Sequence, residues 1–338
     1  MTTRIAVIGA GSWGTTLADL LAVKGYPVTL WCYEAELAER MQRTRENDLY
    51  LPGFQLDKGL EVTAEMATAV AGRQLLVFVS PSQVTRQVVQ QALPFVDPAA
   101  LFVSAAKGIE NDSLMLLSEV FAELLSEQQL ARVGYLSGPS FAREVSQQMP
   151  TAVVAAARRQ EIAEQIQQIF STSQFRVYTH NDIIGVELGG ALKNVIALAA
   201  GVADGLGFGY NTRAALITRG LAEMTRLGLK LGGAAETFAG LAGMGDLVLT
   251  CTGDLSRNRS VGIELGKGRR LKEVLAGMQM VAEGVKTTLS AYQLARKHQV
   301  EVPIIEQMYQ ILYRNKEPRV AVTDLMQRGL KAEPVSGD

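Results

Sequence analysis

A glycine-rich turn near the start of the chain constrains the fold more than any other feature. The run Gly9-Ala10-Gly11-Ser12-Trp13-Gly14 follows a strand-like segment, Arg4–Ile8, and opens a helical pattern. In such a turn Gly9 permits the tight bend, Gly11 lets the backbone approach a pyrophosphate, and Gly14 allows close packing of helix on strand. The helix N-terminus then offers free N–H groups to the anion. The pattern predicts a dinucleotide-binding βαβ unit.

An acidic residue favours a bound dinucleotide over the alternative, a glycine-rich turn without a ligand. Glu34 lies 20 residues after Gly14, close to the offset at which an acid binds the adenosine ribose. An acid squarely at the end of the second strand favours NAD, whereas a nearby arginine accommodates the extra phosphate of NADP. Here Cys32 and Tyr33 follow Trp31, so the acid comes late. Three arginines follow on the next helix, and we expect them to be solvated charges: Arg40, Arg43 and Arg45. The predicted cofactor is NAD or NADP, and the sequence does not choose between them.

The first half of the chain alternates strand-like runs with amphipathic stretches, and the second half does not. The candidate strands are Arg4–Ile8, Val28–Trp31, Leu75–Val79, Leu101–Ser104, Tyr135–Ser137, Thr151–Ala155 and Phe175–Tyr178. This alternation predicts a parallel sheet with helices on both faces. Long helical patterns follow at Ile183–Val202, Thr212–Leu229, Leu271–Met278, Lys286–Lys297 and Ile304–Tyr313. We predict an α/β then all-α chain: a Rossmann-type doubly wound sheet over residues 1–180, a helical substrate-binding and catalytic domain over 181–330, and a loose tail over 331–338.

The composition fits a protein of two ordinary domains and disfavours several classes of protein. The chain has 338 residues, of which 48% are hydrophobic and 20% are charged. Its net charge of -1 does not suggest a nucleic-acid or membrane-surface binder. Cys32 and Cys251 are far apart in sequence, as expected of free thiols in a reducing compartment. Because we find no signal-peptide pattern and no apolar run near the ~20 residues of a membrane helix, we expect a soluble, cytoplasmic protein without stable membrane insertion.

One lysine stands in an almost wholly small or apolar stretch, Gly189–Gly201. On a helix, the same-face neighbours of Lys193 include no acid: they are Gly189, Gly190, Ile196 and Ala197. Burial pushes the pKa of such a lysine down, so that it can exchange a proton near neutral pH. The alternative, which is common, is a lysine whose stem lies on apolar surface while its head reaches water. Asp246, between glycines and an apolar run, either caps a helix or orients Lys193.

Polar residues follow three of the predicted strands, at the edge where ligands gather in open α/β sheets. Lys107 comes after Leu101–Ser104 and directly before a glycine, so we expect this cation to face a ligand. The run Gly138-Pro139-Ser140-Phe141-Ala142 follows Tyr135–Ser137 in the same way. Ser82, which is next to a proline, is more typical of a helix cap.

A second anion site is indicated at Ser256-Arg257-Asn258-Arg259, which reads as an N-cap serine followed by a helix. Two arginines in a first helical turn conflict with the helix dipole. The conflict disappears if the helix end holds an anion, which backbone N–H groups and an arginine would grip together. The alternative is that Arg257 and Arg259 pair with acids elsewhere, such as Asp254.

Together these motifs closely resemble those of the bacterial NAD(P)-dependent glycerol-3-phosphate dehydrogenases. The resemblance extends from Ile5 to about Tyr313, and the order and spacing of the motifs make it specific. The matching runs are Gly9-Ala10-Gly11-Ser12-Trp13-Gly14, Ala106-Lys107-Gly108, Ser137-Gly138-Pro139-Ser140-Phe141-Ala142, Leu188-Gly189-Gly190-Ala191-Leu192-Lys193-Asn194-Val195, Gly245-Asp246-Leu247-Val248-Leu249-Thr250-Cys251-Thr252, Ser256-Arg257-Asn258-Arg259 and Glu283-Gly284.

The resemblance implies a role for each matched position. Lys193 corresponds to the catalytic lysine that accepts and returns a proton. The implied substrate contacts are Lys107, Gly138, Ser140, Lys193, Asp246, Ser256, Arg257 and Asn258. The implied cofactor contacts are Ser12, Trp13, Tyr33, Lys107, Ala142, Arg257, Val281 and Glu283. Tyr33 stands where relatives often carry histidine or arginine. The family also implies a homodimer that interconverts dihydroxyacetone phosphate and sn-glycerol 3-phosphate for phospholipid synthesis.

Residues and resemblance together give a mechanistic hypothesis. The helix start at Ser256–Asn258 holds the substrate phosphate and fixes the reacting carbon near the hydride donor. Lys193 exchanges the proton of the substrate oxygen, Lys107 adds positive charge near that oxygen, and Asp246 holds Lys193 in place. No metal is needed, and the two histidines, His180 and His298, have no ligand spacing with each other.

Two other functions compete with this hypothesis. A related two-domain hydroxy-acid dehydrogenase would also use a lysine on a helix, and a carboxylate could occupy the predicted anion site. A cofactor-sensing regulator would bind a dinucleotide without turnover, but it should carry a basic DNA-reading helix or a partner-binding appendage. The sequence shows neither of these two features.

Overall fold

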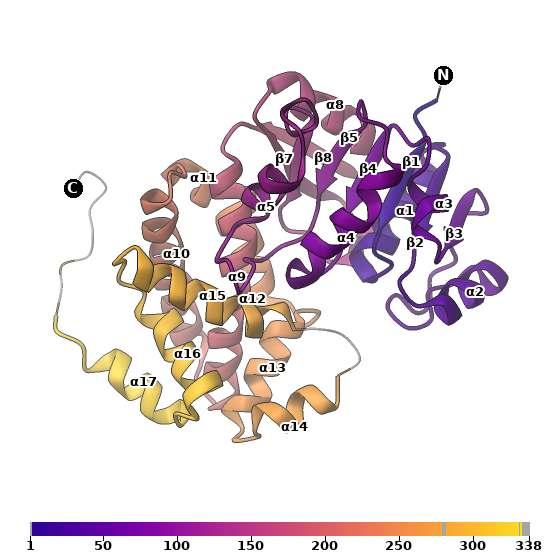
Figure 1. Cartoon of the computed structure of the whole chain (residues 1–338). Helices are drawn as coiled ribbons and strands as arrows, with labels where there is room; N and C mark the ends of the chain where they lie inside the picture. The colour runs from indigo at the N-terminus through magenta and orange to yellow at the C-terminus, as the bar shows by residue number, and fades with distance from the viewer. Residues whose placement is uncertain (1, 279–281, 331, 333–338) are drawn as a thin grey trace.

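The first part of the protein is an eight-stranded sheet with the order β3-β2-β1-β4-β5-β6-β7-β8 (Figure 1). The computed structural model describes residues 2–278, 282–330 and 332. The predicted class, an α/β sheet followed by helices, is confirmed. The strands are β1 (Ile5–Ile8), β2 (Val28–Trp31), β3 (Leu60–Thr63), β4 (Leu75–Phe78), β5 (Leu101–Ser104), β6 (Val133–Ser137), β7 (Thr151–Ala157) and β8 (Phe175–His180).

Helices cover both faces of the sheet because its strands are apolar on both sides. In β1, Ile5 and Val7 join one hydrophobic core, whereas Ala6 and Ile8 join another on the opposite face. Such two-sided burial is typical of parallel strands. The helices of this part are α1 (Ser12–Val23), α2 (Ala35–Thr44), α3 (Met66–Val70), α4 (Thr85–Ala92), α5 (Leu117–Leu124), α6 (Glu127–Leu130), α7 (Ala142–Ser146) and α8 (Gln160–Phe170).

One pair of strands departs from the parallel arrangement that the sequence predicts. β7 runs antiparallel to β6 and pairs Val154 with Ser137, whereas the other neighbouring pairs of the described sheet are parallel. The link between these two strands holds only the five-residue helix α7. A helix of five residues spans only about 7.5 Å along its axis, which is too short to carry the chain back to the edge where a parallel strand would begin. The short link therefore keeps Gly138–Ala142 at the edge where the parallel strands end.

The sequence prediction missed β3, the strand that closes one edge of the sheet. Its four residues alternate between buried and more exposed positions, and Glu61 is exposed. This strand is short, half exposed and carries a charge, so it lacks the apolar run that marks the buried strands.

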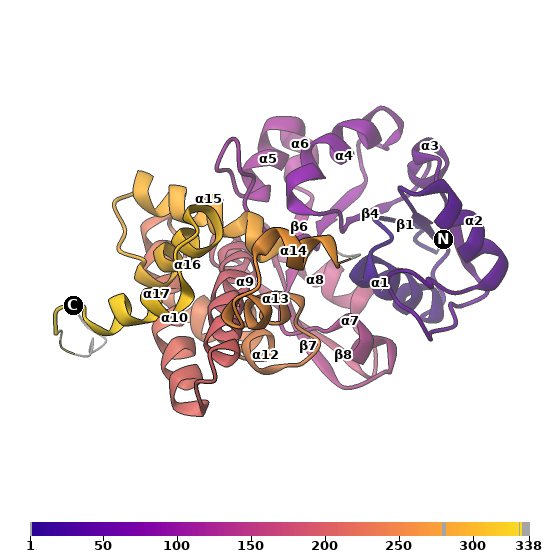
Figure 2. The same ribbon diagram turned by 90° about the horizontal axis from the view of Figure 1, so that it is seen from below.

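The second part of the protein is built around α9 (Ile183–Gly205), a helix of 23 residues. Figure 2 shows other helices packed around it. Among the described residues it is the one helix long and apolar enough to cross a membrane, but 83% of its most apolar 18-residue window is buried inside the protein. A helix so covered by its neighbours is a core helix. The others are α10 (Tyr210–Lys230), α11 (Ala235–Ala239), α12 (Asp246–Thr252), α13 (Arg257–Gly266), α14 (Leu271–Ala276), α15 (Glu283–Lys297), α16 (Pro303–Arg314) and α17 (Pro318–Met326).

A short turn joins the sheet to α9. The Nδ1 atom of His180 accepts the backbone N–H of Asp182 at 2.9 Å, and Asp182 caps α9 by accepting the N–H of Gly185 at 2.8 Å. His180 therefore stabilises this turn. The division into domains at residue 180 stays a prediction. The predicted loose tail lies almost wholly outside the described residues.

Glycines bring α9 and α13 unusually close together. A Cβ atom on Gly201 would lie 2.1 Å from the carbonyl oxygen of Arg259, and one on Gly262 would lie 2.2 Å from that of Leu198. Gly205 and Gly266 repeat this contact one turn further along, so small residues four apart line both helices. The close approach holds the start of α13 against the middle of α9, where Lys193 is.

The glycine contact between α9 and α13 predicts a stability effect. We expect Gly262→Ala to lower the free energy of unfolding by about 1–3 kcal/mol, because the added methyl group overlaps backbone that cannot move away easily. Chemical denaturation measures the loss. Gly329→Ala is the control, since a Cβ atom there has no heavy atom within 4 Å. Equal stability of the two variants would contradict the tight packing.

Candidate active site

Two lysines share one buried carboxylate at the junction of the sheet and the helical part. Lys193 of α9 lies 2.7 Å from Asp246 Oδ1, and Lys107 of the loop after β5 lies 2.6 Å from Asp246 Oδ2. Asp246 is 1% exposed and Lys193 is 8% exposed. Lys193 is therefore a buried, paired lysine, and its head does not reach out to bulk water. Of the two alternatives for Asp246, the structure shows the ion pair, because the N-cap of α12 is Gly245.

Burial and charge act against each other on these groups. Burial lowers the pKa of Lys193 to about 8, although the Asp246 carboxylate acts to raise it and Lys107 lowers it further. Burial also acts to raise the pKa of Asp246, but the two ammonium groups hold that pKa below its usual value. Near neutral pH the three side chains therefore carry a net positive charge, in a site from which water is largely excluded.

Thr250 is a polar residue that touches this group and has no role predicted from the sequence. The Lys193 ammonium donates to Thr250 Oγ1 at 3.0 Å, and that hydroxyl donates to the Asp246 carbonyl oxygen at 2.6 Å. Thr250 lies four residues after Asp246 on α12, a spacing that puts the two on one helix face and was a usable signal. Asn194, which follows Lys193, likewise has no role predicted from the sequence, and its side-chain oxygen accepts from Asn258.

The loop after β6 holds Lys107 from the other side. The Lys107 ammonium and the Ser140 hydroxyl both donate to the carbonyl oxygen of Gly138, at 3.1 and 3.0 Å. Gly138 has a φ of +136°, and a Cβ atom there would lie 2.9 Å from Val153 Cα, so only glycine fits this bend. Gly190 leaves room for the stem of Lys107, which a Cβ atom would approach to 3.4 Å. The structure thus brings Lys107, Gly138 and Ser140 together as the resemblance implies.

The two arginines at the start of α13 have different surroundings. Ser256 is the N-cap and accepts the N–H of Arg259 at 3.3 Å. The Arg259 guanidinium pairs with Asp204 at 2.8 Å and with Asp254 at 2.9 Å, so for this arginine the pairing alternative is correct. Arg257 is exposed at the first position of the helix. The predicted anion site therefore depends on Arg257 and the helix start.

Asn258 connects this helix start to the lysine helix. Its Nδ2 donates to Asn194 Oδ1 at 2.9 Å, and its Oδ1 accepts the N–H of Gly284 at 3.0 Å. The amide therefore fixes the first turn of α13 beside Lys193 and beside the start of α15, where Glu283 is the first residue.

The turn between β1 and α1 has the shape that a pyrophosphate needs. Gly9 has a φ of +119°, a Cβ atom on Gly14 would lie 1.8 Å from the Gly9 oxygen, and nothing lies within 4 Å of such an atom on Gly11. No side chain caps α1, so the first N–H groups of this helix remain available to an anion. The residues present therefore fit a dinucleotide.

The remaining predicted cofactor contacts come from several elements. Ala142 begins α7, and its carbonyl oxygen accepts from Thr16 of α1 at 3.3 Å. Tyr33 is 81% exposed beside the end of β2. Burial raises the pKa of Glu283, and its carboxylate accepts the backbone N–H of Ser82. Val281 lies outside the described residues.

The expectation that Ser82 caps a helix is wrong. Ser82 belongs to a 3₁₀ turn, Ser82–Val84, whose N-cap is Pro81. Its hydroxyl accepts from the Gln83 amide at 3.3 Å, while its backbone bonds Glu283. This turn therefore serves as a contact between the sheet and α15.

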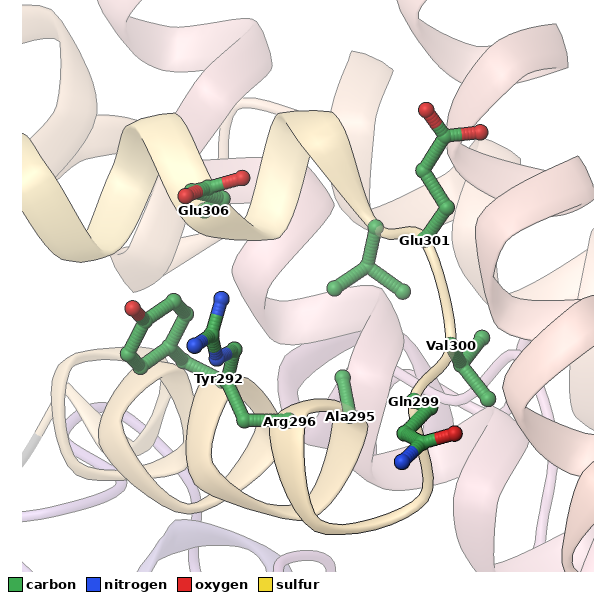
Figure 3. A pocket seen from close by; sticks show the side chains of 8 residues that line it. Tyr292, Ala295, Arg296, Gln299, Val300, Glu301 and Glu306 are labelled. Atoms are coloured by element: carbon green, nitrogen blue, oxygen red, sulfur yellow. The ribbon is translucent and has the colours of Figure 1, made fainter.

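A separate hollow of about 500 Å³ lies between α15 and α16 (Figure 3). Tyr292 and Arg296 extend from α15 toward α16, which carries Glu306. The residues that line the hollow come from these two helices and the segment joining them. None of them belongs to the group around Asp246.

Comparison with known proteins agrees with the motifs and the geometry. Residues 4–163 match the family described as NAD-dependent glycerol-3-phosphate dehydrogenase N-terminus, and residues 182–323 match its C-terminus. The chain belongs to the NAD-dependent glycerol-3-phosphate dehydrogenase family. The resemblance inferred from the sequence is thus confirmed, and the alternative of a related hydroxy-acid dehydrogenase is not favoured.

The similarity extends over the full length of the relatives. The glycerol-3-phosphate dehydrogenase [NAD(P)+] of Syntrophotalea carbinolica is 64% identical over 98% of this chain and 99% of its own. That of Geobacter sp. strain M21 is 63% identical over 99% and 100%. The crystal structure of glycerol-3-phosphate dehydrogenase from Coxiella burnetii has a TM-score of 0.92 at 40% identity and covers 97% of this chain and 99% of its own. The protein is an oxidoreductase of this NAD(P)-dependent family.

The shared carboxylate predicts how the pKa of Lys193 responds to mutation. We expect a pKa of about 8 in the native protein, well below the ordinary lysine value of 10.5. Asp246→Asn should lower this pKa further, because it removes the negative charge that stabilises the ammonium. A carbon-13 NMR titration of labelled lysine side chains measures both values, and Lys193→Met identifies the signal. An ordinary pKa in the native protein would contradict the buried site.

Proposed function

We propose that the protein reversibly transfers hydride between a nicotinamide dinucleotide and dihydroxyacetone phosphate, giving sn-glycerol 3-phosphate, and that Lys193 is its proton donor and acceptor. The observation that carries the proposal is the pair of lysines on one buried carboxylate, in a chain of this family. The dinucleotide, NAD or NADP, supplies the hydride when bound. The residues of the chain supply the proton, the charge and the positioning.

Lys193 has the surroundings that a proton-transfer group needs. With a pKa of about 8 it is protonated at neutral pH, yet it loses its proton more readily than an ordinary lysine. In the direction of reduction it donates to the carbonyl oxygen, and in the reverse direction it removes the proton of the C2 hydroxyl. Asp246 and Thr250 hold the ammonium in one direction, since both bond the Nζ atom.

Lys107 stabilises the negative charge that develops on the reacting oxygen. Its ammonium lies on the other oxygen of the same carboxylate, so two cations flank one anion. In a buried site this excess of positive charge stabilises an alkoxide more strongly than it would in water. Gly138 and Ser140 support this arrangement, because the Gly138 carbonyl fixes Lys107 and Ser140 at one point.

The start of α13 binds the substrate phosphate in this proposal. Arg257 is exposed at the first position of the helix, and Ser256 leaves backbone N–H groups of the first turn facing the same end. Asn258 ties this end of the helix to Asn194, next to Lys193. Phosphate binding there would place the carbonyl carbon near the proton donor. The binding energy of the phosphate, which does not react, would then orient the reacting carbon.

The wider setting of the enzyme is also part of the proposal. We infer a soluble cytoplasmic homodimer that supplies the glycerol phosphate backbone of phospholipids. The full-length likeness to bacterial glycerol-3-phosphate dehydrogenases supports this setting. Nucleic-acid binding and stable membrane insertion are not part of it, in keeping with the net charge of -1 and the burial of α9.

Removal of the Lys193 ammonium tests the proposed chemistry. We expect Lys193→Met to lower kcat with dihydroxyacetone phosphate on the order of 10²–10⁴-fold, as for loss of a general acid, with nearly unchanged dinucleotide affinity. In the native enzyme, kcat for reduction should fall as the pH rises through about 8, because the donor loses its proton. Absorbance of the reduced cofactor follows the reaction. Lys230→Met, at the exposed end of α10, is the control.

Two results would overturn this assignment. Retention of most of kcat in Lys193→Met would show that another group moves the proton. If the native protein oxidises neither NADH nor NADPH with dihydroxyacetone phosphate, the proposed reaction itself is wrong.

Removal of the Arg257 guanidinium tests the phosphate site. We expect Arg257→Ala to raise KM for dihydroxyacetone phosphate by about 10- to 100-fold, because charged hydrogen bonds of that strength are lost. Steady-state kinetics at saturating cofactor measures KM. Arg319→Ala, an exposed arginine on α17, controls for the loss of surface charge. An unchanged KM would show that the substrate phosphate does not bind at Arg257.

A further inference from the structure

We propose that Glu34 makes this enzyme select NADH over NADPH, and that Tyr50 positions the Glu34 carboxylate for this selection. The inference rests on the dinucleotide-binding function proposed above. It concerns the adenosine end of the cofactor, which lies away from the reacting atoms. Glu34 acts here as a specificity-determining residue and Tyr50 as a positioning residue.

Glu34 lies where the ribose of a dinucleotide on the glycine-rich turn would be. β1 and β2 are parallel neighbours, with Ile8 opposite Trp31, and the N–H of Gly9 donates to the Trp31 carbonyl oxygen at 3.1 Å. Since adjacent strands are about 4.8 Å apart, the turn after β1 and Glu34 after β2 leave the same edge side by side. Glu34 is the N-cap of α2 but makes no cap hydrogen bond with its side chain. Its carboxylate is therefore not used by the helix.

Tyr50 holds the Glu34 carboxylate at a fixed place. The Tyr50 hydroxyl donates to Glu34 Oε1 at 2.7 Å. Burial and the neighbouring Glu34 raise the pKa of Tyr50 to about 12, so the hydroxyl keeps its proton at neutral pH. Glu34 Oε2 accepts the Cys32 thiol at 3.6 Å, a weak donor, and a carboxylate oxygen keeps a further lone pair for a ribose hydroxyl.

A buried asparagine connects Tyr50 to the glycine-rich turn. The amide nitrogen of Asn47 donates to the Ala10 carbonyl oxygen and to Thr15 Oγ1, both at 2.8 Å. The amide oxygen of Asn47 accepts the backbone N–H of Tyr50 at 2.9 Å. Asn47 is completely buried. Asn47 therefore links the proposed pyrophosphate site to the backbone of Tyr50, and the Tyr50 hydroxyl links to Glu34, so these contacts restrict the distance between the two ends.

The three arginines after β2 do not offset this negative charge. Arg40 makes a two-pronged pair with Asp48, with its Nε 3.1 Å from Oδ2 and its Nη2 3.1 Å from Oδ1. Arg45 donates to the backbone carbonyl oxygens of Leu60 and Asp57. Arg43 is in the last turn of α2, about 12 Å along the helix from its start beside Glu34.

The charge at this point decides between the two cofactors. NADH presents a 2′-hydroxyl, which donates a hydrogen bond to a carboxylate. NADPH presents a 2′-phosphate, whose negative charge would lie against Glu34, while the charge of Arg40 is already paired with Asp48. Like charges held together at a binding interface are strongly unfavourable, which corresponds to a preference for NADH on the order of 100-fold.

Direct binding measurements test the selection without any turnover. Calorimetric titration of the full-length protein with NADH and with NADPH gives both dissociation constants. We expect the native protein to bind NADH on the order of 100-fold more tightly. Glu34→Ala should weaken NADH and strengthen NADPH, which brings the ratio of the constants below about 10. Tyr50→Phe should shift the ratio part of the way, because the carboxylate remains but is no longer held. The ratio of kcat/KM for the two cofactors should follow the same order.

Glu36→Ala is the matched control, since it removes an exposed acid from the first turn of the same helix. We expect it to leave the NADH to NADPH ratio unchanged. Equal or tighter binding of NADPH by the native protein would overturn the proposal. If Glu34→Ala weakens the binding of both cofactors equally, Glu34 has only a structural role, and this result would also overturn the proposal. An unchanged ratio in Tyr50→Phe would overturn the role of Tyr50. Binding of neither cofactor would instead overturn the function proposed above, and this inference with it.

Discussion

The site depends on one carboxylate placed between two ammonium groups. A buried ammonium or carboxylate without a partner is strongly destabilising, because burial removes it from water. Asp246 meets this requirement for Lys107 and Lys193 at once, at 2.6 and 2.7 Å. Because two cations share one anion, the group keeps an excess positive charge inside the protein. Burial lowers the pKa of Lys193, Asp246 acts to raise it, and Lys107 lowers it further. The excess positive charge makes the site suited to a negatively charged oxygen.

Glycines in α9 allow the other elements to come this close. A Cβ atom on Gly189 would lie 2.4 Å from the Ala242 carbonyl oxygen, just before α12 begins with Asp246. Gly201 serves the approach of α13 in the same way. Glycine in a helix costs about 1 kcal/mol relative to alanine, so this sequence weakens α9 by itself. The packing of α12 and α13 on the helix offsets that cost, and the same contacts bring Asp246 and Asn258 to Lys193.

The sequence predicted the features that depend on local order and missed those that depend on packing. The turn at Gly9–Gly14 is recognisable because its spacing and the strand before it are adjacent in the chain. The partner of Lys193 cannot be recognised in this way, because Asp246 is 53 residues away from it in the sequence. Lys107, which shares the same carboxylate, lies 139 residues from Asp246. Local reasoning could offer Asp246 only as one of two alternatives, and the reversal at β7 follows from a link length whose effect appears only in the assembled sheet.

The arginines of α13 show how the structure resolves a conflict that the sequence only poses. Two cations at a helix N-terminus oppose the helix dipole. Asp204 of α9 and Asp254 together balance the charge of Arg259, and Asp204 also pairs with Arg213 at 2.6 Å. Arg257 lies at the exposed first position, and its charge acts to lower the pKa of the buried Glu283 carboxylate, against the effect of burial. A substrate phosphate at that helix end would accept from the N–H groups of the first turn and from the Arg257 guanidinium together, so the helix end and the arginine both contribute to binding an anion.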